Sequence, residues 1–279
     1  MQIGAIVQAR TSSTRLPGKV LMELPYGSCV TVLQQVIRRL KRSKRLGDII
    51  IATTTDKADE KIVKLAEKEK VKWFRGSLDN VLERYYLAAK ENVLDVIVRI
   101  TSDCPCIDPE VVDFLVEEHL RAGVDYSSND LPATYPSGLD VEVMNFSALE
   151  ESYKKAEKDF DREHVSSYIY KTKPEAFNIQ TVRAPADLTD PEIRVTIDTQ
   201  EDYTLLCIVF DYLYSGNEFF GAKDIIKLFH DKPWLKAINK GVICKKRFDS
   251  LQEEIEEAIR ILDLQDLKRA KEILARYMQ

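Results

Sequence analysis

The sequence of 279 residues lacks any apolar run long enough to cross a membrane, which argues against a bilayer-spanning protein. Its first residues, MQIGAIVQAR, also lack the basic start and small-residue cleavage site of a secretory leader. No internal repeat or low-complexity segment is present, which excludes solenoids and disordered linkers. We therefore expect a cytoplasmic globular protein without a membrane partner.

Metal-binding and disulfide-forming residues are scarce. The chain has three histidines and five cysteines, an odd number of scattered thiols that argues for reduced cysteines and against a disulfide framework. Cys104 and Cys106 form half of a zinc-like pair, but no second pair accompanies them. We expect all the thiols to be structural: Cys29, Cys104, Cys106, Cys207 and Cys244.

An excess of positive charge is also absent, since the net charge is −5. This disfavours indiscriminate nucleic-acid binding, which relies on a broad basic field, so we expect no nucleic-acid partner. The first strand is not followed by G-x-G-x-x-G, which excludes a dinucleotide fingerprint. Gly18-Lys19 is not a Walker loop either, because it has no glycine five residues earlier and no Ser or Thr after it. Any anion site must be a local cluster of cations.

What the first half does contain is a regular alternation of apolar runs and amphipathic segments. Strands rich in β-branched residues on both faces, separated by helices, predict an α/β fold with a parallel sheet covered on both sides. The expected strands are 3–8, 49–53, 72–75 and 96–101, and the expected helices are 30–42, 59–70, 80–92 and 109–123. The polar loops that follow these strands should meet at the carboxyl edge of the sheet, where ligands bind.

The second half is less regular. Residues 127–138 read as a turn-rich loop, followed by a strand over 139–146. We further expect helices at 147–158, 161–171 and 200–214, and strands at 177–185 and 193–198. The tail from 248 is charged and amphipathic, with spacing that suits helices packing on the body or on another subunit. We therefore predict a main domain over 1–240, a helical extension over 241–279 and a homodimer.

The stretch AIVQARTSSTRLPGKVL, residues 5–21, places three cations directly after a buried strand. Gly18 and the small residues allow backbone amides to approach an anion, and Arg10, Arg15 and Lys19 supply the charge that an oligophosphate requires. The alternative is a basic turn whose side chains lie in solvent.

Two aspartates follow apolar strands. Asp103 and Asp198 are placed to hold Mg²⁺, which takes one or two carboxylates together with phosphate oxygens. Helix capping is the alternative role. For the helix after Asp103 that role fits Asp108 better, because Asp108 directly precedes Pro109. Asp198 or Thr199 could equally cap the helix that begins near 201.

Other polar residues suit an acceptor molecule. Asp140 and Glu142 alternate along an expected strand, so both should point the same way and could receive sugar hydroxyls. Three residues near a helix start add further polar groups, namely Arg162, Glu163 and His164. An anionic acceptor would instead favour Arg162, His164 or Arg194.

Seven motifs in collinear order resemble the spore coat polysaccharide biosynthesis protein F family, relatives of the acylneuraminate and 3-deoxy-manno-octulosonate cytidylyltransferases. They are IVQARTSSTRLPGKVL, IIIATTTD, KWFRGSLDNVLERYY, IVRITSDCPCIDPEVVD, TYPSGLDVEV, REHVSSYI and VTIDTQEDY, which together span roughly residues 1–240.

This resemblance implies a three-layer nucleotide-diphospho-sugar transferase fold, CTP and a small sugar as substrates, and dependence on Mg²⁺. By position, Arg10, Arg15 and Lys19 would be catalytic and bind the triphosphate, and Asp103 and Asp198 would bind the metal. The implied nucleotide-binding set is Gln8, Ala9, Arg10, Ser13, Arg15, Lys19, Thr54, Gly76, Ser77 and Arg84. The implied acceptor set is Asp140, Glu142, Arg162, Glu163, His164 and Arg194.

Three other functions stay open at this point. A glycosyltransferase of the same fold would use a ready-made nucleotide sugar and a D-x-D motif, of which SDC supplies only one aspartate. A catalytically silent binding partner would depend on its C-terminal helices. A nucleotidyltransferase could also use another base, and the acceptor sugar is not legible.

Overall fold

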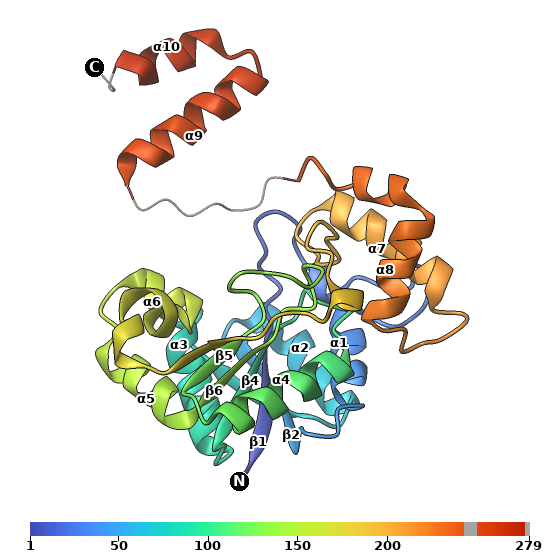
Figure 1. The fold of residues 1–279 in the computed structure, drawn as a ribbon, viewed down its shortest axis with the longest axis vertical. Coiled ribbons are helices and arrows are strands. Elements are labelled where there is room, and N and C mark those ends of the chain that lie inside the picture. The colour runs from blue at the N-terminus through green and yellow to red at the C-terminus, as the bar shows by residue number, and fades with distance from the viewer. Residues whose placement is uncertain (243–249, 277–279) are drawn as a thin grey trace. The chain divides into compact units, whose positions relative to one another are not determined.

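A seven-stranded mixed sheet lies within the part of the chain that precedes residue 242 (Figure 1). The computed structural model describes residues 1–242 and 250–276. The strand order is β3-β2-β1-β4-β6-β5-β7. The strands are β1 (Ile3–Gln8), β2 (Asp48–Thr54), β3 (Lys72–Gly76), β4 (Val96–Thr101), β5 (Tyr126–Ser128), β6 (Glu142–Asn145) and β7 (Ile179–Thr181).

The sheet is parallel wherever the sequence alternates strand and helix. β1 pairs in parallel with both β2 and β4, β2 pairs in parallel with β3, and β6 is the antiparallel neighbour of β4 and β5. Strands that are apolar on both faces require cover on both faces. The predicted α/β class with a mostly parallel sheet is confirmed, and the carboxyl ends of the first four strands meet at one rim.

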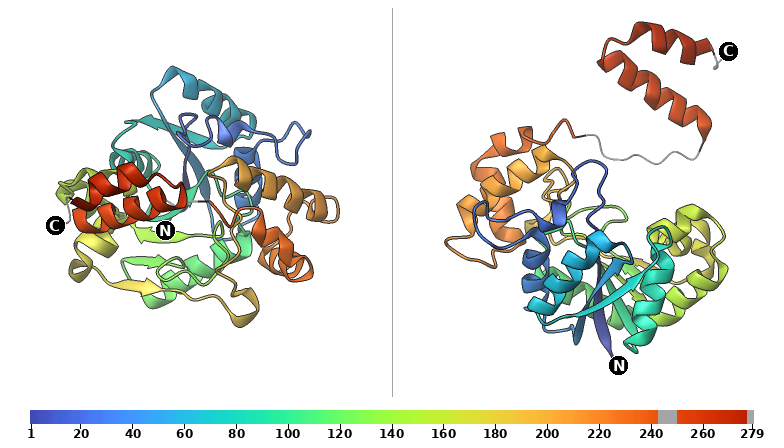
Figure 2. Two further views of the ribbon diagram at one scale, coloured as in Figure 1. Left: turned by 90° about the horizontal axis from the view of Figure 1, so that it is seen from above. Right: turned by 180° about the vertical axis from the view of Figure 1, so that it is seen from behind.

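Two layers of helices cover the sheet, as the views in Figure 2 show. One face packs against α1 (Val32–Leu40), α2 (Glu60–Lys68), α4 (Pro109–Ala122), α7 (Gln200–Leu213) and α8 (Ala222–Asp231). The other packs against α3 (Val81–Glu91), α5 (Phe146–Lys155) and the region of α6 (Asp159–His164). Single turns of helix complete the list: η1 (Lys19–Leu21), η2 (Lys57–Asp59), η3 (Tyr168–Thr172), η4 (Pro174–Ala176), η5 (Ala186–Leu188) and η6 (Pro233–Ala237).

Some elements differ from the sequence predictions. The strand expected at 193–198 is not a ladder strand, because Val195 bonds to Ser137 and Ile197 bonds to Asp103 in loops instead. The helix expected over 161–171 ends at His164, where Val165 takes a positive φ of 58°. β5 and α8 were not predicted, although the buried residues of α8 have helical spacing: Ala222, Ile225, Ile226 and Phe229.

The chain divides into two compact units, Met1–Gly241 and Val242–Gln279. The second contains α9 (Leu251–Leu264) and α10 (Lys268–Arg276), which pack on each other.

Among the described residues, the cysteines Cys29, Cys104, Cys106 and Cys207 are free thiols, and Cys244 lies outside the described residues. Within the same described part, no helix is long and apolar enough to cross a membrane.

Two glycines provide a matched test of backbone constraint. Both have positive φ, but a Cβ on Gly138 would lie 2.7 Å from the Val195 carbonyl carbon, whereas a Cβ on Gly123 would meet nothing within 4 Å. We expect Gly123→Ala to lower the free energy of unfolding by roughly 1–2 kcal/mol and Gly138→Ala by about 3 kcal/mol or more. Urea denaturation of both variants measures this. Equal losses would contradict the close approach at Gly138.

Candidate active site

The loop after β1 is folded back on itself at Thr11. The Thr11 carbonyl accepts N–H groups from Ser13 at 3.0 Å and Gly18 at 2.9 Å. Gly18 has a φ of 73°, which glycine adopts without strain, and η1 begins at the next residue. The turn therefore directs Lys19 from the end of β1 toward the sheet.

Asp59 attaches this loop to the neighbouring one. Its carboxylate, 1% exposed, accepts both the N–H and the hydroxyl of Thr11 at 2.7 Å, and its other oxygen accepts the Thr54 hydroxyl. Hydrogen bonds to an ionised acceptor are stronger than neutral ones. The sequence analysis missed Asp59, because its signal is only an acidic residue at a helix start.

Lys19 lies between the two predicted metal ligands. Its ammonium is 2.7 Å from Asp103 Oδ2 and 3.0 Å from Asp198 Oδ1, and it also donates to the Ile197 carbonyl at 2.6 Å. Burial opposes the charge, but the two carboxylates outweigh it and hold the pKa of Lys19 above its ordinary value. The predicted cation and both predicted carboxylates therefore meet at one point.

Asp198 is surrounded by cations. Besides Lys19, it accepts Arg15 Nη2 at 2.7 Å and Arg194 Nη2 at 2.8 Å. Burial alone would raise the pKa of Asp198, but Lys19, Arg194 and Arg15 hold it below its ordinary value. Arg15 thus belongs to the site and not to a solvent-exposed turn. Arg194, predicted to face the acceptor, contacts this cluster, and its acceptor role stays a prediction.

Asp202 holds both Arg194 and Asp198 in place. Its fully buried carboxylate accepts Arg194 Nε at 3.0 Å and the Asp198 N–H at 2.9 Å. Together with Thr199 it forms the capping box of α7. The N-terminal cap of α7 is therefore Thr199 and not Asp198. The N-terminal cap of α4 is Asp108, as predicted, and its side chain accepts the Glu110 N–H. Neither Asp103 nor Asp198 caps a helix, and Asp202 was missed from the sequence.

The donor set suits Mg²⁺. Two carboxylates that approach one ammonium within 3.0 Å converge closely enough to share a cation, and hard oxygen ligands are the ones that Mg²⁺ prefers. In residues 1–242 and 250–276, no group of three or more His, Cys, Asp or Glu side chains could hold a metal. Phosphate oxygens and water would have to complete such a site.

The predicted acceptor residues are arranged differently from expectation. Asp140 precedes β6 instead of lying within it, so the strand alternation that joined it to Glu142 is wrong. Glu142 forms an ion pair with Arg99 of β4, and Asp140 accepts the Gly138 N–H at 3.0 Å. Burial, reinforced by the nearby charge of Asp130, raises the pKa of Asp140 to about 7.

The residues around α6 belong to the other helix layer. The His164 ring lies 4.7 Å from the Phe160 ring and its Nε2 is 4.0 Å from Glu163. α6 packs beside α3. The acceptor roles of these three residues stay predictions.

Several predicted nucleotide residues have local partners. Gln8 accepts Arg99 at 3.4 Å, Ala9 donates its N–H to Ala52, and the Ser13 hydroxyl accepts the Leu16 N–H. Farther along the rim, the Gly76 carbonyl accepts the Thr55 N–H, and the Ser77 hydroxyl accepts the Asn80 N–H. Their backbone and side chains shape the loops at the rim, and nucleotide contact stays a prediction.

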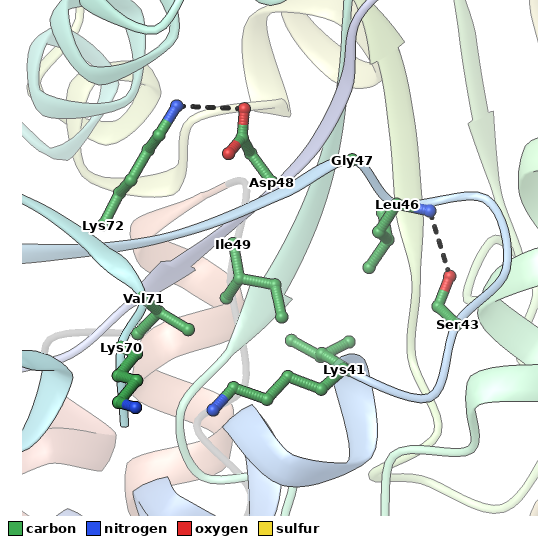
Figure 3. A pocket seen from close by; sticks show the side chains of 10 residues that line it. Lys41, Ser43, Leu46, Gly47, Asp48, Ile49, Lys70, Val71 and Lys72 are labelled. Carbon is green, nitrogen blue, oxygen red and sulfur yellow. Dashed lines mark hydrogen bonds and ion pairs between the residues drawn. The ribbon is translucent and has the colours of Figure 1, made fainter. Parts of the chain in front are cut away.

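A cavity of about 350 Å³ lies elsewhere (Figure 3). It opens beside Asp48 and Lys72, the first residues of β2 and β3, and is therefore at the opposite end of these strands from the rim. Lys41 and Lys70 follow the carboxyl ends of α1 and α2, where positive charge stabilises the helix dipole. The lysines of this cavity thus have a structural explanation, and it is not the candidate active site.

Comparison with known proteins gives the family. A model of the family described as cytidylyltransferase matches residues 4–273. The chain belongs to the cytidylyltransferase family. It is 35% identical over 230 residues to the spore coat polysaccharide biosynthesis protein SpsF of Bacillus subtilis, covering 82% of this chain and 94% of that protein. The predicted family resemblance is confirmed, and the protein is a nucleotidyltransferase-family enzyme.

Solved structures agree with this family membership. A cytidylyltransferase from Leptospira borgpetersenii superposes with a TM-score of 0.77 at 32% identity, covering 90% of this chain and all of that chain. A CMP:2-keto-3-deoxy-manno-octonic acid synthetase complexed with CTP superposes with a TM-score of 0.56 at 15% identity, over 76% and 99% of the two chains. The second likeness shows a shared fold, which confirms the predicted fold class.

Loss of the Asp59 anchor should loosen the cationic loop. We expect Asp59→Ala to speed tryptic cleavage after Arg10 and Arg15 by roughly tenfold or more, because hydrogen bonds to a charged group contribute about 1.5–3 kcal/mol each. Asp59→Asn retains an oxygen acceptor for Thr11 but loses the charge, so as the matched control its cleavage rate should lie between those of wild type and Asp59→Ala. Timed proteolysis of the folded protein measures the rates. Unchanged cleavage in Asp59→Ala would contradict the anchoring role.

The raised pKa of Asp140 predicts a pH-dependent stability. Its ordinary pKa is 3.8, so between about 4 and about 7 the folded chain retains a proton that the unfolded chain has released. Stability contributed by this group therefore falls as pH rises through that window and is constant above it. We expect Asp140→Asn to gain thermal stability over wild type at pH 8 and to lose most of that advantage at pH 4.5. Parallel pH profiles would refute this.

Proposed function

We propose that the protein transfers the cytidylyl group of CTP to a sugar and releases pyrophosphate, with dependence on Mg²⁺. The observation that supports this most is the convergence of Lys19 and Arg15 with Asp103 and Asp198 at the carboxyl ends of the strands. Cations that could bind an oligophosphate thus lie beside carboxylates that could bind its metal ion. They lie at the carboxyl ends of parallel strands, which is where proteins with parallel sheets bind their ligands. The spore coat protein and the CTP complex among its relatives and fold neighbours agree with this substrate class.

The cationic side chains would bind and orient the triphosphate. Arg15 offers a forked guanidinium and Lys19 a point charge, and Arg10 is exposed at the rim. Because both Arg15 and Lys19 contact Asp198, they are held in place before a substrate arrives. Such preorganised charge stabilises the negative charge that develops on the leaving pyrophosphate.

Asp103 and Asp198 would hold Mg²⁺ together with phosphate oxygens. When bound, the ion neutralises phosphate charge and aligns the groups. Arg194 contacts Oδ2 of Asp198, the oxygen that Lys19 does not contact, and Asp202 accepts the Asp198 N–H. A metal-binding carboxylate supported in this way needs little rearrangement.

The reaction requires mainly that the protein position the sugar oxygen and the α-phosphorus. A sugar oxygen forms a bond to the α-phosphorus in line with the bond that breaks to pyrophosphate, and the hydroxyl proton leaves to solvent or to a nearby base. Asp140 and Glu142, near the start of β6, are proposed to face the acceptor. We further propose that the acceptor is a precursor of a surface polysaccharide and that the chain works as a homodimer.

Pyrophosphate release tests this function. We expect release with CTP, Mg²⁺ and one member of a panel of sugars, sugar acids and sugar phosphates, and none with nucleotide sugars. A glycosyltransferase would show the reverse, and a silent binding partner would show no metal-dependent thermal shift with CTP.

Lys19→Met should remove most turnover without unfolding the chain. We expect a loss of at least about a hundredfold, because a preorganised cation at developing charge contributes 10²–10³ in rate. The fold should persist, because Arg15 and Arg194 still compensate Asp198 and Asp103 is partly exposed to solvent. The exposed Lys64→Met on α2 serves as the control with unchanged rate. Near-full pyrophosphate release by a folded Lys19→Met protein would defeat the assignment.

A further inference from the structure

The C-terminal unit is a helical hairpin that has no core of its own. α9 and α10 run antiparallel, joined by residues 265–267, and pack on each other (Figure 1). Among residues 250–276 none is buried, and Leu251, Leu264 and Ile273 are 71%, 72% and 60% exposed. Two short helices bury too little apolar surface to offset the entropy of ordering them. The hairpin therefore needs another surface to pack against.

The hairpin has one apolar face. The Lys271 ammonium is 2.6 Å from an Asp263 carboxylate oxygen, which marks the seam between α10 and α9. Relative to this seam, helical spacing places the apolar stripes of the two antiparallel helices on the same side. The residues of this face are Leu251, Ile255, Ile259, Leu262, Ile273 and Leu274. Leu264, which is equally exposed, falls on the opposite side of α9.

The charges of the hairpin are complementary to the hairpin itself. α9 carries five acidic residues and one basic residue, whereas α10 carries four basic residues and one acidic residue. Residues 242–279 hold eight residues of each sign, so the net charge of −5 belongs to the rest of the chain. A two-fold interface must match itself, and an acidic helix beside a basic one meets this condition when two hairpins face each other. The charge pattern thus favours a second copy as the partner.

We propose that the hairpin of α9 and α10 binds the same hairpin of a second copy of this chain, forming a four-helix bundle in which each α9 lies beside the α10 of the other copy. This inference rests on the homodimer of the proposed function and assigns it an interface. The apolar faces would be buried between the two hairpins. Glu254 and Arg276 lie on the outer flanks of α9 and α10, one turn from the first residue of α9 and at the last residue of α10. In this bundle Glu254 would lie beside Arg276 of the partner subunit.

Two leucines of equal exposure test the apolar face. Light scattering and sedimentation of the full chain over a range of concentrations measure the dimer dissociation constant. We expect Leu251→Glu to weaken dimerisation roughly tenfold or more, because a charge would be desolvated in the bundle. Leu264→Glu introduces the same charge outside the face and should stay within about twofold of wild type.

A charge exchange between chains tests the pairing of α9 with α10. Glu254→Lys and Arg276→Glu each place like charges together twice in a homodimer, so each alone should weaken dimerisation roughly three- to tenfold. Mixing the two variants restores an opposite-charge pair at both places. Differently tagged copies of the two variants should therefore form a heterodimer in preference to either homodimer.

The outcomes separate this inference from other interfaces and from the transfer reaction. A monomeric wild-type chain would overturn it, and so would a dimer that Leu251→Glu leaves intact. A hairpin that packs on its own chain would give a lower melting temperature in Glu254→Lys without any gain from mixing, which also overturns it. Pyrophosphate release from CTP, measured on the same samples, tests the proposed transfer separately, so either idea can fail while the other holds.

Discussion

The structure depends on one shared cation. Two carboxylates close together repel, and Lys19 makes their approach favourable by contacting Asp103 and Asp198 at once. The three residues come from the loop after β1, the end of β4 and the extended segment before α7. The contact therefore exists only when the parallel strands are in register and the second half of the chain has folded onto the first.

Two further buried carboxylates position the segments that carry Lys19 and Asp198. Asp59 holds the loop that carries the cations, and Asp202 holds the segment that carries Asp198. Both accept backbone N–H groups together with side-chain donors, so their charge is compensated without solvent. The residues proposed to contact the substrate are thus held in place by Asp59 and Asp202, which position them.

Different kinds of side chain lie along different parts of the rim. Positive charge and the carboxylates of Asp103 and Asp198 gather beyond β1 and β4, the Arg84 guanidinium lies by β3, and acidic groups lie near the start of β6. This order follows the strand order of the sheet. The lysine-lined cavity at the other end of the strands has no such arrangement, because its cations serve helix ends and carboxylates.

The sequence by itself determined the α/β class, the strands β1 to β4 and the rim, because period-2 and period-3.6 patterns are local and parallel strands share one direction. It also pointed to Lys19, Arg15, Asp103 and Asp198, since polar residues that follow parallel strands meet at one edge of the sheet, but it left a basic turn in solvent and helix capping open as alternatives. Only the tertiary structure decided that Asp59 and Asp202 anchor the site, that 193–198 bonds to loops instead of a ladder, and that Arg84 lacks a partner. Each of these depends on whether residues far apart in the chain contact each other. The local periodicity of a sequence does not contain that information.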